Sequence, residues 1–168
     1  MSAKKYVTVT KLLDRANKIQ QAMEEVSYTS VYIGIPVEES SRPDEGEPIN
    51  NAELAYIHEH GSPINNIPPR PFLKPSIKKN LATVEVLQKQ MIKAALKGDK
   101  EGVKRSAELL GMHSRNNAKK YITAGTNLTP NKPATIKRKG SDKPLIDTGA
   151  LLNSISYVVD DDRGGARQ

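Results

Sequence analysis

The sequence contains no cysteine and no tryptophan, and Phe72 is its one phenylalanine. The absence of cysteine excludes a disulfide framework, a thiolate metal site and a cysteine nucleophile. The apolar runs are too short to cross a bilayer, and the first residues lack the apolar region of a signal peptide. We therefore expect a soluble protein that is made in the cytoplasm.

Apolar residues make up only 36% of the 168 residues, so the core must be built mainly from Leu, Ile, Val and Ala. This length suits one domain rather than two. Because such a core is modest for the length, we expect neighbouring copies to order part of the chain.

The net charge of +7 is distributed unevenly along the chain. Residues 36–62 contain seven acidic side chains and one Arg, whereas residues 73–122 contain twelve Lys or Arg and four acidic side chains. Two opposite patches allow head-to-tail contact between copies, which closes into a ring when the rotation permits it. Two solvated faces would give the same pattern, so the charge distribution leaves both interpretations open.

The spacing of apolar residues predicts two helices and two short strands within the first 61 residues. Residues 11–25 predict an amphipathic helix capped by Thr10. Its apolar positions are Leu12, Ala16, Ile19 and Met23. Alternation predicts short strands at residues 5–9 and 30–36. Residues 51–61 predict a short helix that starts at an Asn51 cap and stops at Gly61.

Helical spacing then runs from Pro75 to Ile122 with an interruption near Gly98 and Asp99, which predicts a helical hairpin or a kinked rod. The two apolar stripes are Leu81, Val84, Leu87, Met91 and Ala95, followed by Val103, Ala107, Leu110, Ala118 and Ile122. A turn capped by Asp147 leads into a last strand, which has Ile155, Tyr157 and Val159 on one side. The predicted fold class is α+β, with a small, mostly antiparallel sheet, an N-terminal helix, a long helical hairpin and extended loops.

Two polar, proline-containing segments separate these elements. Residues 36–51 and 124–144 have too few apolar side chains to fold alone, and we expect them to be extended arms of a single domain over residues 1–159. Residues 160–168 are predicted to be a disordered tail.

The sequence shows no pattern typical of catalysis. Phosphate-cradling and esterase motifs are absent, and the acidic residues cluster in a segment that is a poor scaffold for an acid-base pair. His58 and His60 would point about 200° apart on a helix, unlike the i, i+4 pair of zinc hydrolases. We predict no enzymatic activity, no cofactor and no metal; loss of a turnover on changing either histidine would favour an enzyme with an unrecognised motif.

Nucleic-acid binding without sequence specificity is the alternative function. Lys-rich stretches between residues 78 and 143 could neutralise phosphates without any motif. However, few aromatic side chains are available to stack bases, and no DNA-reading module is present.

Two segments are more specific than these patterns. "LAYIHEHGSPINNIPPRPFLKPSI" and "PATIKRKGSDKPLIDTGALLNSISY" resemble, in this order, two signatures of a family of virion morphogenesis proteins of long-tailed bacteriophages. The first signature maps to Tyr56, Glu59, Gly61, Pro69, Arg70, Pro71, Phe72, Leu73 and Pro75. The second maps to Pro144, Leu145, Asp147, Thr148, Gly149, Leu151, Ser154 and Ile155. Together they cover a little under a third of the chain.

The resemblance implies a structural protein of the phage neck, in tail completion or as a tail terminator. It implies a ring of copies, a hexamer, that joins the tail tube to the head connector, with connector, neck and tail proteins as partners and the virion as its location. A ring lumen would also bring basic side chains near passing DNA. Family members often continue after the second signature into another strand, whereas here the chain ends within eleven residues of Tyr157. We therefore expect a smaller sheet, or one completed by a partner subunit.

The prolines around Phe72 restrict the backbone, and we expect this ring to anchor the start of the long helix against the sheet. A proline-rich ligand for an adaptor domain is the alternative for this stretch. Arg70 is expected either to face a neighbouring subunit or to lie on the surface. Deletion of residues 38–48 is expected to impair assembly and to leave the monomer folded.

Overall fold

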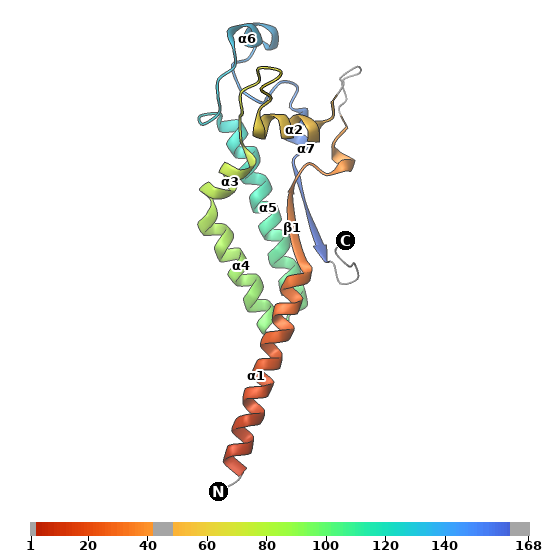
Figure 1. Cartoon of the computed structure of the whole chain (residues 1–168), viewed down its shortest axis with the longest axis vertical. Coiled ribbons are helices and arrows are strands. Elements are labelled where there is room, and N and C mark those ends of the chain that lie inside the picture. Colours follow the sequence, from red (N-terminus) through yellow and green to blue (C-terminus); the bar gives the residue numbers. More distant parts are fainter. Residues whose placement is uncertain (1–2, 42–48, 162–168) are drawn as a thin grey trace. The chain divides into compact units, whose positions relative to one another are not determined.

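The structure is a computed structural model that describes residues 3–41 and 49–161, with side chains from residue 9 onward (Figure 1). Its elements are α1 (Ala3–Tyr28), β1 (Thr29–Gly34), the 3-10 helix η1 (Val37–Glu39), α2 (Asn51–His60), α3 (Leu73–Lys79), α4 (Leu81–Leu96), α5 (Lys100–Ala124), α6 (Pro133–Lys139), α7 (Ala150–Ser154) and β2 (Ser156–Asp161). β1 and β2 pair as a two-stranded antiparallel sheet, so the predicted α+β class is confirmed. Within the described ranges, no helix is both long enough and apolar enough to span a membrane.

The chain divides into two compact units. One contains Met1–Val31, Glu85–Leu110 and Val159–Gln168, and the other contains Tyr32–Val84 and Gly111–Val158. Because α4, α5 and both strands include residues of each unit, the single domain expected over residues 1–159 stays a prediction.

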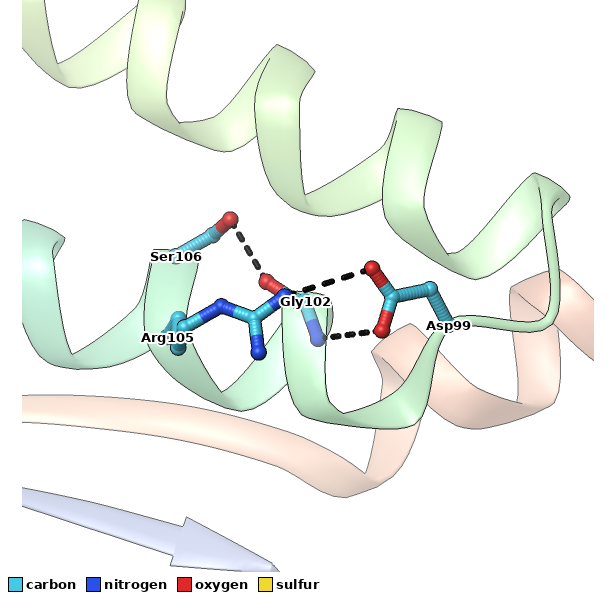
Figure 2. A network of polar contacts seen from close by, with 4 residues as sticks. All are labelled: Asp99, Gly102, Arg105 and Ser106. Carbon is cyan, nitrogen blue, oxygen red and sulfur yellow. Dashed lines mark hydrogen bonds and ion pairs between the residues drawn. The ribbon is translucent and has the colours of Figure 1, made fainter.

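The first unit contains the helical hairpin that was predicted around Gly98 and Asp99. Its buried core residues are Ala22, Met91, Ala95, Val103 and Ala107. At the turn, an Asp99 carboxylate oxygen accepts the backbone N–H of Gly102 at 2.8 Å and caps α5, as Figure 2 shows. The other carboxylate oxygen lies 3.4 Å from Arg105 Nη2, and the Ser106 hydroxyl donates to the Gly102 carbonyl at 2.7 Å. Asp99 therefore fixes the point at which α5 begins.

The second unit has its own core around Phe72, which is 3% exposed. The other buried members are Ala118, Ile122, Leu128, Leu145, Leu151 and Ile155. Phe72 is thus buried at the start of a helix, as expected. That helix is the short α3 rather than one long rod, and the buried members of this core lie outside β1 and β2. α3 starts at Leu73 and ends at Lys79, with Asn80 as its C-cap, and Pro75 lies in its first turn, where proline is tolerated.

The N-terminal helix differs most from its prediction. Residues 5–9 belong to α1 and not to a strand, so Thr10 lies inside the helix and not at its N-terminus. The predicted apolar face is exposed: Leu12 and Met23 are 58% and 69% exposed, and among the described side chains of α1 the buried core residue is Ala22. Helical spacing identified the helix but could not show which surface, if any, would cover its apolar face.

Four further expectations differ from the structure. The α2 cap is Asn50, whose side chain forms a reciprocal capping box with Glu53, and Asp147 does not cap α7, which starts after Gly149 without a side-chain cap. The segment 124–144, expected to be an arm, contains α6 and the buried residue Leu128. β2 extends through Asp160 and Asp161, and the rest of the expected tail, like residues 42–48 of the acidic arm, lies outside the described residues.

Candidate functional site

The first signature forms a fixed joint between α2 and α3. Glu59, at the end of α2, accepts backbone N–H groups of three successive residues: Phe72 at 2.8 Å, Leu73 at 3.0 Å and Lys74 at 3.1 Å. Phe72 provides no side-chain cap for α3, so the Glu59 carboxylate satisfies the N–H groups that the first turn of a helix leaves free. Its role here is to cap a helix from 13 to 15 residues away in the chain.

Gly61 makes this joint possible. It ends α2 with φ of 78°, a conformation that side chains rarely adopt. A Cβ atom at this position would lie 3.0 Å from both the Ile67 carbonyl oxygen and the Pro69 nitrogen. Glycine is therefore required both by the backbone angle and by the close return of the loop.

Arg70 connects the first signature to residues 129–130 and is buried, with 9% of its surface exposed. Its Nε donates to the Thr129 carbonyl at 2.7 Å and its Nη2 to the Pro130 carbonyl at 3.1 Å. The Thr129 hydroxyl donates to the Pro69 carbonyl at 3.2 Å. Neither expected position for Arg70 accounts for these contacts, because the guanidinium ties the proline loop to the segment that leads into α6.

The second signature surrounds the same place. Arg70, Leu145, Asp147, Thr148, Gly149 and Leu151 all line a cavity of about 320 Å³, which we call the basic cavity. A second cavity of about 280 Å³ is lined by Tyr56, Glu59, Phe72, Leu73 and Ile155. The remaining signature residues line neither cavity; these are Gly61, Pro69, Pro71, Pro75, Pro144 and Ser154.

The basic cavity also includes residues that sequence reasoning did not select as site residues. The polar ones are Asn51 and His58 on one face of α2, Asn131 before α6, and Thr135, Arg138 and Lys139 on α6. Nothing in their local spacing identifies them as a group, because they come from separate segments that meet only in the folded chain. By sequence alone, the "KRK" run, which contains Arg138 and Lys139, is only one of the basic stretches that could neutralise nucleic-acid phosphates.

The cavity has a positive electrostatic environment. Arg70, Arg138 and Lys139 line it against a single carboxylate, Asp147. Burial, together with the charges of Arg70 and Lys139, lowers the pKa of His58 to about 4. Burial also lowers the pKa of Lys139, although Asp147 opposes this effect. His58 is therefore neutral near pH 7, and the lining keeps an excess of positive charge.

A different surface feature belongs to the first unit. On α1, five large apolar side chains are each more than half exposed: Val9, Leu12, Leu13, Ile19 and Met23. We call this the α1 apolar face. It is a second candidate functional surface because such a set of apolar side chains is typical of a contact with another chain.

Comparison of the chain with known protein families, curated proteins and solved structures finds no match.

Proposed function

We propose that this chain is a structural subunit of a bacteriophage virion, which assembles with copies of itself into a ring, a hexamer, at the junction between head and tail. The chemistry of the first signature supports a structural role. Glu59 binds backbone N–H groups, Arg70 binds backbone carbonyls, and Phe72 lies in the core. These side chains hold segments of the same chain together, which is what a rigid ring subunit needs.

The α1 apolar face is the observation that carries the assembly proposal. Within the described part of α1, residues 9–21 are all exposed, and Ala22 is buried. In proteins, most of the stability of a helix comes from packing its apolar face against other parts of the structure. A second copy of the chain is the partner we propose for this face, since the family signatures imply a ring of copies.

The first experiment is to measure the solution mass of the purified protein by light scattering across protein concentration and salt. We expect a ring of about six times the monomer mass, or a monomer that forms rings when tail tube or connector is added. Electron microscopy of the resulting species would count the subunits. If the protein stays monomeric with tail tube or connector but its solution mass increases when DNA is added, the proposal is overturned and the nucleic-acid alternative is favoured.

A double variant tests the contact surface. Leu12→Glu with Met23→Glu places charges on the α1 apolar face, and we expect it to give monomers with helical content unchanged by circular dichroism. The matched control is Ile64→Glu, because Ile64 is also an exposed apolar residue, at 97%, but lies in the loop after α2. Rings that persist in the α1 variant, or that are lost in the control, would contradict this assignment of the interface.

A further inference from the structure

The basic cavity contains buried polar atoms without a partner. Asn51 is 2% exposed, and its Nδ2 donates to the Ser41 carbonyl at 3.2 Å. Its Oδ1, and Nδ1 of His58, are buried and make no hydrogen bond within the described chain. Both residues line the cavity from α2. Buried polar atoms are nearly always paired in folded proteins, so these two atoms, on residues that line one cavity, lack a partner that the described chain does not supply.

The fixed groups define the charge of that ligand. Arg70, Arg138 and Lys139 face the cavity together with Asp147, so the lining carries more positive than negative charge. The two carbonyls that bind Arg70 hold its guanidinium in place. Cationic side chains and a neutral His58 that can donate from Nδ1 favour an oxyanion.

Asn51 adds a second requirement, because a free amide oxygen accepts hydrogen bonds and cannot donate them. The ligand must therefore bring a hydrogen-bond donor as well as negative charge. Sulfate and carboxylates carry no such donor near pH 7. A hydrogenphosphate group carries both an anionic oxygen and an O–H group, and a hydroxyl elsewhere in the same molecule would serve equally. The cavity volume of about 320 Å³ lies at the small end of the range typical of small-molecule sites.

We propose that the basic cavity binds a small phosphate-bearing molecule, whose anionic oxygens face Arg138 and Lys139 and whose O–H group donates to Asn51. This inference goes beyond the structural role proposed above and does not depend on ring formation. Phosphate binding would join α2, α6 and α7 through one ligand, because each helix contributes to the lining.

The test uses the full chain in a phosphate-free buffer, with NMR titrations of inorganic phosphate, adenosine monophosphate and sulfate. We expect phosphate or the nucleotide to shift the His58 ring and Asn51 amide signals in a saturable way, and sulfate to bind about tenfold more weakly, since one hydrogen bond is lost. Bound oxyanion should also raise the pKa of His58 from about 4, because negative charge favours the imidazolium. A merely structural His58 would show no such shift.

Variants assign the effect to the cavity. Lys139→Gln is expected to weaken phosphate binding about tenfold, because a charge-assisted contact is removed. Lys137→Gln is the matched control, because Lys137 lies on the same helix and does not line the cavity. If Lys139→Gln fails to fold, Arg138→Gln takes its place, because Arg138 is an exposed residue. Asn51→Ala should abolish the preference for phosphate over sulfate.

Three outcomes would overturn the proposal. The first is the absence of a saturable shift with either phosphate or the nucleotide. The second is equal binding of sulfate and phosphate, or equal weakening by Lys137→Gln and Lys139→Gln. The third is binding of a Glu-rich peptide that phosphate does not displace, which would make the cavity a contact for an acidic protein segment.

Discussion

At the scale of the residue, His58 shows how burial sets the charge of a site. The imidazole lies in the basic cavity, where burial and the charges of Arg70 and Lys139 lower its pKa to about 4. In an unfolded chain the same group titrates near pH 6.5. Between these two pH values the unfolded state binds more protons than the folded state, so protonation of His58 opposes folding there.

The stabilisation that comes from a neutral His58 should therefore be fully present above about pH 6.5 and be lost as the pH falls toward 4. Between pH 6.5 and pH 4, we expect the protonation of His58 to lower the free energy of unfolding by about 2 to 3 kcal/mol. Urea unfolding in phosphate-free buffers measures this change. His58→Gln should remove that part of the pH dependence. His60→Gln, on the exposed side of the same helix, is the control and should keep it; equal slopes for all three proteins would contradict this account.

At the scale of the element, the start of α3 depends on a carboxylate from another helix. Glu59→Gln keeps the shape of the side chain but removes the charge that accepts three backbone N–H groups. We expect a loss of about 1 to 2 kcal/mol in the free energy of unfolding. Glu85→Gln makes the same chemical change at an exposed i, i+4 pair with Lys89 and should cost about 0.5 kcal/mol or less. Equal losses would show that Glu59 caps nothing of consequence.

The contact between α5 and β2 depends on the absence of a side chain. A Cβ atom at Gly111 would lie 2.8 Å from two atoms of the Tyr157 ring, so the ring occupies the space above this residue. Alanine favours a helix over glycine by about 1 kcal/mol, but overpacking typically costs about 1 to 3 kcal/mol. We therefore expect Gly111→Ala to destabilise the protein in thermal or urea unfolding. In a cycle with Tyr157→Ala, the double variant should lose less stability than the sum of the single variants; simple additivity would rule out this steric conflict.

Sequence patterns predicted elements well where the information is local. The stripe from Val103 to Ile122 is buried as expected, and Gly61 ends α2, because helical period and backbone angles are properties of neighbouring residues. The role of Glu59 was not predictable, since its partners lie 13 to 15 residues away. The basic cavity escaped prediction for the same reason: α2, α6 and the segment before α7 meet only through the fold.

At the scale of the whole molecule, the acidic segment 36–51 has a local role as well as its proposed role in assembly. The carbonyls of Ser40 and Ser41 accept hydrogen bonds from the backbone and the side chain of Asn51, at 2.8 and 3.2 Å. Deletion of residues 38–48 would remove both acceptors at the start of α2. The deletion is therefore expected to disturb the monomer as well as the assembly, and it cannot separate the two.

Charge substitution separates them, because it leaves the backbone in place. Glu45→Gln with Glu47→Gln removes two of the seven negative charges in residues 36–62, and we expect a weaker ring with the thermal midpoint of the monomer unchanged. The matched control, Glu85→Gln with Glu101→Gln, removes two carboxylates from the basic half and should leave the ring intact or strengthen it. If opposite patches pair head to tail, added salt should weaken the ring of the native protein more than it weakens the ring of the Glu45→Gln, Glu47→Gln variant. Light scattering of all three proteins at low and high salt measures this difference, and identical salt dependence would mean that the two charged regions are only solvated faces.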